Sequence, residues 1–321
     1  MGTAIFVPRH GDASVLEERD HDPGPPGPGQ VRVAVAASGI NFIDIYFRSG
    51  QYAGTPPFIC GLEGAGTIEA VGSGVDLRAG QRVAWSGVSG SYATHVLAPA
   101  TALVPIPDGV PDETAAAAML QGMTAHYLVH GCRETSPGDT ALVHAAAGGA
   151  GLLLVQTLVA AGARVIATCS TGEKAALARE AGAEEVVLYS RDDFVEPARA
   201  FGDGGVDVVY DSVGRTTFEG SLGSLRPRGL LVLFGQSSGA VPPFDPQQLQ
   251  WAGSVFLTRP TLMNYLAAPG ELEMRAGAVL NAILSGELRI RVGARFPLSE
   301  AAAAQRALEE RRTTGKVLLL P

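Results

Sequence analysis

The chain has 321 residues, which is enough for about two domains of ordinary size. Hydrophobic residues make up 46% and charged residues 17%, so the sequence predicts a packed core and excludes wholesale disorder. The formal charge of −8 gives no basic surface for nucleic acid or an anionic membrane, and no apolar run reaches the ~18 residues of a membrane span.

The first part of the chain, up to about residue 120, is predicted to be mainly β. Residues 1–10 lack a basic segment followed by an apolar one, so we expect a first strand there rather than a signal peptide. A turn-rich stretch at 23–29 precedes an alternating strand at 31–35, and further strands are predicted at 66–71, 81–85 and 92–96. A proline and two acids at 111–113 begin an alanine-rich helix.

From about residue 125 the pattern changes to alternating strands and helices. Strands are predicted at 141–144, 164–168, 185–189, 206–210 and 230–234, with helices between them that include 172–181 and 192–200. Continuous apolar strands separated by helices are typical of a parallel sheet covered on both faces. A helix at about 299–312 and a strand at 316–320 follow, and that strand can complete the N-terminal β domain.

A glycine-rich segment at 144–151 follows one predicted strand and begins a helix. This is the context of a dinucleotide-binding loop, where small residues let the backbone approach a pyrophosphate at the helix N-terminus. The match is partial, because Ala146 stands where the motif has its first glycine. The alternative is a close-packed turn between strand and helix.

The end of the next strand, at 165–170, carries no acid. An NAD site usually has Asp or Glu there to bind the ribose 2′-hydroxyl. Ser170 and Thr171 are neutral donors, and Lys174 lies one helical turn further on, so the sequence predicts NADPH rather than NADH. Glu173 is the one dissenting residue, and a solvated surface lysine is the alternative.

Four other features carry less weight. The three cysteines fit no zinc or disulfide spacing and indicate a reduced, cytoplasmic protein, while His126 and His130 are four residues apart without a third ligand and favour ordinary packing. His144 is expected to be structural. Residues 235–239 fit the G-x-S-x-G nucleophile elbow, but the proline-rich continuation at 240–243 opposes the helix that a hydrolase needs there.

Several separated motifs resemble one family. They lie at 41–52, at the G-x-E-x-A-G turn of 61–66, at 145–151, at 210–214 and at 229–235. The chain resembles the zinc-independent quinone oxidoreductases of the zeta-crystallin type, within the medium-chain dehydrogenase/reductase superfamily. The resemblance implies an α/β fold, with a GroES-like β-rich catalytic domain at 1–124 and 262–321 and a Rossmann, doubly wound parallel-sheet domain for NADPH at 125–261.

The resemblance also bears on metal use. Zinc-dependent relatives have an early cysteine ligand, a Gly-His-Glu turn and a four-cysteine lobe. Here Asn41 stands near the cysteine position, Leu62 replaces the histidine and the lobe has no counterpart. We therefore expect no metal site.

The implied activity is reduction of a quinone, a small molecule, by NADPH. Reduction of an enone carbon–carbon double bond and NADPH binding with little turnover remain alternatives. Amide and phenol donors can stabilise the oxyanion that develops on the acceptor, and a tyrosine or solvent can supply the proton. Alternatively, Tyr46 and Tyr52 only pack against a bound ring, and Asp44 only braces its loop.

The edge strand at 254–258 is expected to pair in a homodimer. The resemblance implies catalytic roles for Asn41, Tyr46, Tyr52 and Arg259, and cofactor contacts by Thr124, Gly148, Gly149, Gly151, Ser170, Lys174, Tyr189, Phe234, Gly235, Ser237 and Arg311.

Overall fold

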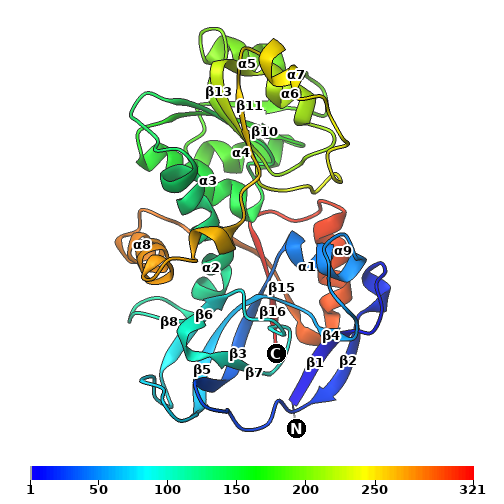
Figure 1. Cartoon of the computed structure of the whole chain (residues 1–321), viewed down its shortest axis with the longest axis vertical. Helices are drawn as coiled ribbons and strands as arrows, with labels where there is room; N and C mark the ends of the chain where they lie inside the picture. The colour runs from blue at the N-terminus through cyan, green and yellow to red at the C-terminus, as the bar shows by residue number, and fades with distance from the viewer. Residues whose placement is uncertain (1) are drawn as a thin grey trace. The chain divides into compact units, whose positions relative to one another are not determined.

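The computed structural model describes residues 2–321, which form two compact units (Figure 1). The first unit runs to Met123 and resumes at Leu272–Pro321, and the second is Thr124–Glu271. Residues 262–271 thus belong to the second unit, whereas the sequence analysis assigned them to the first. One physical reason is Tyr265, whose ring stacks on Tyr127 of the second unit with centroids 4.4 Å apart and planes 13° apart.

The first unit is built mainly from two sheets. A three-stranded sheet has the order β2-β1-β4, and a seven-stranded sheet has the order β15-β16-β3-β5-β6-β8, with β7 also paired to β3. β16 lies antiparallel to β3, so the C-terminal strand does complete this unit. The strands are β1 (Gly2–Val7), β2 (Glu17–His21), β3 (Gln30–Ile40), β4 (Phe58–Ile59), β5 (Glu63–Val71), β6 (Arg82–Ser86), β7 (His95–Pro99), β8 (Leu103–Pro105), β15 (Val292–Pro297) and β16 (Lys316–Leu320).

Four helices accompany these sheets. α1 (Phe42–Ser49) follows β3 directly, α2 (Asp112–Tyr127) runs into the second unit, and α8 (Glu271–Ser285) and α9 (Ala301–Glu309) come from the C-terminal part of the chain. Short 3₁₀ turns are η1 (Ala13–Val15), η2 (Ala100–Ala102) and η5 (Leu298–Glu300). The α-helix predicted at 299–312 is shorter than expected. Its first residues belong to the 3₁₀ turn η5, and α9 ends at Glu309.

The second unit is a six-stranded sheet in which every neighbouring pair is parallel, in the order β11-β10-β9-β12-β13-β14. The order reverses between β9 and β12, as in a doubly wound sheet. The predicted α/β fold is therefore confirmed. The strands are β9 (Thr140–Val143), β10 (Arg164–Cys169), β11 (Glu185–Leu188), β12 (Val206–Asp211), β13 (Leu225–Leu233) and β14 (Phe256–Thr258).

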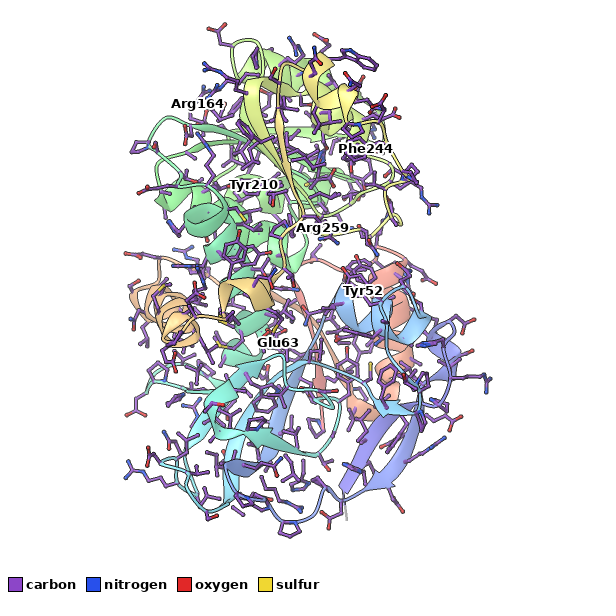
Figure 2. The ribbon with its side chains drawn as sticks, viewed as in Figure 1. Tyr52, Glu63, Arg164, Tyr210, Phe244 and Arg259 are labelled. Carbon is purple, nitrogen blue, oxygen red and sulfur yellow. The ribbon has the colours of Figure 1, made fainter. Side chains whose placement is uncertain are left out.

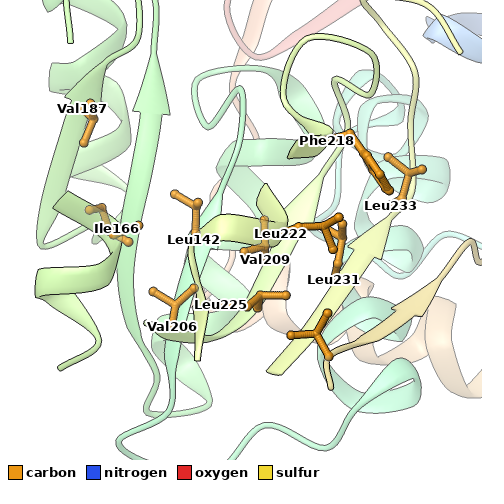
Figure 3. Close-up of a cluster of buried hydrophobic side chains, with 12 residues drawn as sticks. Leu142, Ile166, Val187, Val206, Val209, Phe218, Leu222, Leu225, Leu231 and Leu233 are labelled. Carbon is orange, nitrogen blue, oxygen red and sulfur yellow. The ribbon is translucent and has the colours of Figure 1, made fainter. Parts of the chain in front are cut away.

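Helices cover this sheet and bury its apolar strands. Figure 3 shows Leu142, Val209 and Leu231 from three strands beside Phe218 and Leu222 from α6, all at most 5% exposed. The helical segments are η3 (Leu128–Cys132), α3 (Gly149–Ala160), α4 (Gly172–Glu180), α5 (Val195–Phe201), α6 (Phe218–Gly223), α7 (Gln247–Trp251) and η4 (Leu262–Tyr265). Among the helices of residues 2–321, none is both long and apolar enough to cross a membrane.

Candidate functional site

The predicted dinucleotide loop connects β9 to α3. The strand ends at Val143, the loop occupies 144–148, and α3 begins at Gly149. A Cβ on Gly151 would lie 2.5 Å from the Ala145 carbonyl oxygen and 2.7 Å from the Ala146 Cα, so only glycine permits this close packing of helix on loop. The strand, loop and helix that a pyrophosphate site requires are therefore present, with the free N–H groups of the helix end at Gly149.

His144 fixes the start of this loop. Its ring is 1% exposed, with Nδ1 2.9 Å from Thr168 Oγ1 and Nε2 3.0 Å from Ser221 Oγ. Burial lowers the pKa of His144, which favours the neutral ring between these two hydroxyls. The expected structural role of His144 agrees with this geometry.

The residues expected at the adenosine end gather where β10 and β11 end. Thr171 caps α4, its Oγ1 accepting a hydrogen bond from the Lys174 backbone N at 3.3 Å. Tyr189 follows β11, donates its backbone N–H to the Cys169 carbonyl at 3.2 Å and is 40% exposed. Ser190 Oγ donates to the Ser170 carbonyl at 2.9 Å. The structure thus brings Ser170, Lys174 and Tyr189 to the carboxyl ends of β10 and β11.

The loop after β13 meets the turn after β12. The Phe234 backbone N donates to the Asp211 carbonyl at 2.8 Å, and the Ser237 N donates to the Ser212 carbonyl at 3.2 Å. A Cβ on Gly235 would lie 2.5 Å from that Ser212 oxygen, so the backbones touch here. Residues 234–246, all described, contain no helix before α7, so the strand–elbow–helix of a hydrolase is not formed.

Arg259 follows β14 and lines an apolar cavity of about 400 Å³ within the second unit. Phe218 and Phe244 lie at its wall with ring centroids 5.0 Å apart, and Leu257 adds to it. Arg259 is the single charged lining residue of this cavity among the residues described. Thr124, expected near the cofactor, is 9% exposed on α2.

A buried polar cluster in the first unit contains Asn41. Its Nδ2 donates to Glu63 Oε2 at 2.7 Å and to the Gly39 carbonyl at 3.3 Å. Its Oδ1 accepts from Lys316 Nζ at 2.7 Å and from Gln121 Nε2 at 3.1 Å. Asn41 is 3% exposed, so an acceptor could use this amide only by replacing one of these partners.

The tyrosines expected at the site belong to α1 and the loop after it. Tyr46 is 6% exposed, and its ring centroid lies 5.1 Å from that of Tyr52. Phe47 meets Tyr52 edge-on at 5.7 Å, and the Tyr52 backbone N donates to the Tyr46 carbonyl at 3.0 Å. Figure 2 shows Tyr52 and Glu63 among the side chains of this unit. The two predicted tyrosines are therefore brought together as one aromatic pair.

Asp44 braces the start of α1, as one reading of the sequence proposed. Its Oδ2 accepts from the Asn41 backbone N and from the Tyr92 hydroxyl, each at 2.8 Å. Asp44 is 1% exposed, and burial raises its pKa to about 7, although the two hydrogen bonds and the charge of Lys316 act in the opposite direction.

This pKa predicts a pH-dependent stability. Because the folded carboxyl binds its proton more tightly than the unfolded one, its contribution to the free energy of unfolding is full below about pH 4 and is lost as the pH rises through about 7. The loss is at most about 4 kcal/mol. In Asp44→Asn the amide oxygen can still accept both bonds, so its unfolding free energy, measured by urea denaturation from pH 4 to 8, should fall less with pH than that of the wild type. Parallel profiles would contradict the raised pKa.

Lys316 and Arg311 are basic residues of the first unit. Lys316 was not predicted, although it and Lys174 are the only lysines of the chain beside 22 arginines, a rarity that could have drawn attention to both. Arg311 is exposed after α9 in the first unit, with its backbone at φ +57°, whereas Lys174 belongs to the second unit. His126 and His130 have ring centroids 4.8 Å apart, and within residues 2–321 no group of three or more His, Cys, Asp or Glu could hold a metal ion.

Comparison with known proteins places these features in a family. An alcohol dehydrogenase GroES-like domain matches residues 27–108, and a zinc-binding dehydrogenase domain matches 149–268. The quinone oxidoreductase of Pseudomonas aeruginosa is 46% identical and covers 100% of both chains. A 2-haloacrylate reductase from a Burkholderia species is 42% identical over 93% of this chain and 92% of the relative.

Solved structures agree with these sequence matches. The crystal structure of the Escherichia coli quinone oxidoreductase complexed with NADPH has a TM-score of 0.97, at 40% identity, and covers 99% of this chain and 100% of that one. The expected pairing of a GroES-like with a Rossmann domain is confirmed. Whole-length identity, both domains and the cofactor loop lead to one conclusion: the chain belongs to the quinone oxidoreductases of the medium-chain dehydrogenase/reductase superfamily.

Proposed function

We propose that the protein is an NADPH-dependent quinone oxidoreductase that needs no metal ion. The observation that carries the proposal is the whole-length similarity to quinone oxidoreductases, one of which was crystallised with NADPH. The residues present fit that cofactor, because the loop after β9 excludes a Cβ at Gly151 and the strand β10 ends without an acid. When bound, NADPH supplies the hydride.

Most of the proposed cofactor contacts belong to the second unit. In the proposed complex the backbone N–H groups at Gly149 and Gly151 bind the pyrophosphate. Gly148, whose own N–H donates to the Ala145 carbonyl at 3.0 Å, contacts it as a residue without a side chain. Lys174 with Ser170 binds the 2′-phosphate as charged and neutral donors. Further proposed contacts of this unit lie on the adenosine side, at the loop after β13 and on α2, and comprise Tyr189, Phe234, Gly235, Ser237 and Thr124. Arg311, a residue of the first unit, is proposed as one more contact on the adenosine side.

Most of the proposed acceptor contacts belong to the first unit. Negative charge develops on the acceptor oxygen during reduction, and preorganised hydrogen-bond donors stabilise it. The longer Nδ2 bond of Asn41, 3.3 Å to the Gly39 carbonyl, is the one that an acceptor oxygen can replace. Tyr46 and Tyr52 present phenol donors from one aromatic pair. Arg259, a residue of the second unit, is proposed as a further acceptor contact.

Reduction of a carbon–carbon double bond is the second candidate. It is favoured by the relative named for 2-haloacrylate, a molecule whose double bond is conjugated with a carboxylate. NADPH oxidation should be followed with quinones and with enones, and the products identified. Quinol formation supports the first function, saturated product supports the second, and NADPH binding without oxidation of any acceptor contradicts both.

Activity should survive removal of metal ions. The positions near a zinc site in related dehydrogenases hold Asn41 and Leu62, neither of which is a usual zinc ligand. After extensive chelation we expect no stoichiometric zinc by elemental analysis and an unchanged rate of quinone reduction. Loss of activity that added zinc restores would contradict this.

We also propose a homodimer formed through β14. This strand is an edge of the six-stranded sheet, Phe256 on it is 62% exposed, and nearby Trp251 is 73% exposed. Exposed apolar edges of this kind usually need cover, and a two-fold axis provides it. Light scattering at micromolar concentration should give twice the chain mass of 33.1 kDa.

A pair of variants tests the surface. Phe256→Arg should shift the protein towards the monomer by placing a charge at the covered edge. Met274→Arg changes an apolar side chain that is 49% exposed on α8 in the first unit, and it should leave the dimer intact. A monomeric wild type would contradict the proposed dimer.

A further inference from the structure

A buried ion pair lies against Asn41 and has no part in the function proposed so far. Lys316 begins β16 and Glu63 begins β5, with Nζ and Oε2 2.5 Å apart and side chains 1% and 0% exposed. Glu63 Oε1 also accepts the Leu120 backbone N–H at 2.6 Å, which ties the carboxylate to α2. The two charged groups thus face each other in a space closed to water.

The pair holds both ends of one amide. Lys316 Nζ donates to Asn41 Oδ1 at 2.7 Å, while Glu63 Oε2 accepts from Asn41 Nδ2 at 2.7 Å. A rotation of the amide by a half-turn would place its oxygen against the carboxylate and its NH₂ against the ammonium. Both new contacts would be repulsive at low dielectric, so the pair permits one orientation of Asn41.

The space around the pair is shaped for these two side chains. A Cβ on Gly39 would lie 2.4 Å from Glu63 Oε2 and 2.7 Å from Lys316 Cε, so glycine is required for their approach. A compact ammonium fits there, whereas the planar guanidinium of arginine needs more room. Lysine is used here in a chain whose other basic residues, apart from Lys174, are all arginine.

Stability alone gives no reason for this arrangement. Replacing a buried ion pair by uncharged groups is often neutral or stabilising, because both charges lose their hydration. What an uncharged replacement would lose is the distinction between the oxygen and the nitrogen of the amide. Lys316 also polarises the amide by donating to Oδ1, which makes Nδ2–H a stronger donor.

We propose that Glu63 and Lys316 are positioning residues, which lock the Asn41 amide in the orientation that offers its N–H to the acceptor oxygen. The proposal rests on the proposed reductase function, in which Asn41 contacts the acceptor. Neither charged group touches the substrate, so both act through Asn41.

The test separates positioning from folding by neutralising the pair in steps. Glu63→Gln and Lys316→Gln each leave one buried charge unpaired, so each should lower the melting temperature and the kcat. In the double variant no buried charge remains, and the melting temperature should recover. Its kcat should stay about 10²-fold below wild type, with KM for NADPH unchanged, because the amide orientation is no longer enforced.

A matched control comes from another buried cation of this unit with an acidic partner. Arg48 is 1% exposed and lies 2.6 Å from Glu309, so Glu309→Gln removes a carboxylate from a buried cation as Glu63→Gln does. Glu309→Gln should lower the melting temperature and keep the wild-type kcat. Recovery of kcat together with stability in the double variant would overturn the proposal, since the pair would then be structural only.

A second readout needs no turnover. The chain has three asparagines, and Asn264 and Asn281 are exposed, so selective ¹⁵N labelling of asparagine gives three side-chain amide signals with two internal references. Solvent exchange of the Asn41 amide protons should be at least ~10-fold faster in the double variant than in the wild type, because the charge-assisted bonds that protect them are gone. Equal exchange in the two proteins would overturn the proposal. A wild type that reduces no acceptor but shows the expected exchange would contradict the proposed function and leave the positioning of Asn41 supported.

Discussion

Replacing Asn41 by alanine is expected to lower the kcat of quinone reduction by about 10²–10³-fold, the usual effect of removing one oxyanion donor. The dissociation constant of NADPH should change little, because the proposed cofactor contacts of the second unit, including the loop after β9, do not involve Asn41. Stopped-flow reduction under saturating NADPH and quinone would give the kcat, and fluorescence titration would give the dissociation constant.

Two controls accompany this variant. Asn41→Ala leaves Glu63 and Lys316 paired with each other, so a melting curve shows whether lost activity reflects lost folding. Tyr52→Phe keeps the aromatic contact with Tyr46 and removes the hydroxyl alone, which separates hydrogen bonding from packing. If Asn41→Ala and Tyr52→Phe both turn over like the wild type, the proposed acceptor site is wrong.

Lys174→Ala is expected to remove most of the preference for NADPH over NADH. A hydrogen bond to a charged group contributes about 1.5–3 kcal/mol, so kcat/KM for NADPH should fall about 10- to 100-fold. The value for NADH should stay nearly unchanged, because NADH has no 2′-phosphate for the ammonium to bind. The measurement is the ratio of the two efficiencies in the wild type and in the variant.

Glu173→Gln is the matched control for that experiment. Glu173 is an exposed charge adjacent to Lys174 on α4, so it tests whether any change of charge on this turn alters the preference. We expect the preference for NADPH to persist in Glu173→Gln. Equal use of the two cofactors by the wild type, or an unchanged ratio in Lys174→Ala, would disprove the role assigned to Lys174.

The parts of the fold that the sequence predicted well are those with local causes. The segment around 144–151 combines a short apolar strand, small residues and a helix within one stretch of chain, so its turn could be predicted directly. The strand at 316–320 was also predicted, because Lys316 is followed by a short apolar run, Val317 to Leu320, which is typical of a buried strand.

What the sequence could not predict depends on contacts between distant residues. Lys316 and Glu63 are separated by 253 positions, and no local pattern links them. The sequence analysis placed a domain boundary after residue 261, whereas the second compact unit extends to Glu271. No local pattern predicts this, because Tyr265 stacks on Tyr127, a residue far away in the sequence. The Asn41 amide was predicted as a donor to the acceptor oxygen, but its four partners in the structure could not be predicted, because they come from β3, β5, α2 and β16.

The position of β16 in the chain has a consequence for the order of events during synthesis. The second unit, Thr124–Glu271, is a continuous segment and leaves the ribosome before β15 and β16 do. Until then, Ser38, Gly39 and Ile40 of β3 lack the strand that pairs with them, and the Glu63 carboxylate lacks its cation. A nascent chain can therefore complete its second unit first, while the first unit presents an open strand edge to chaperones until β16 arrives.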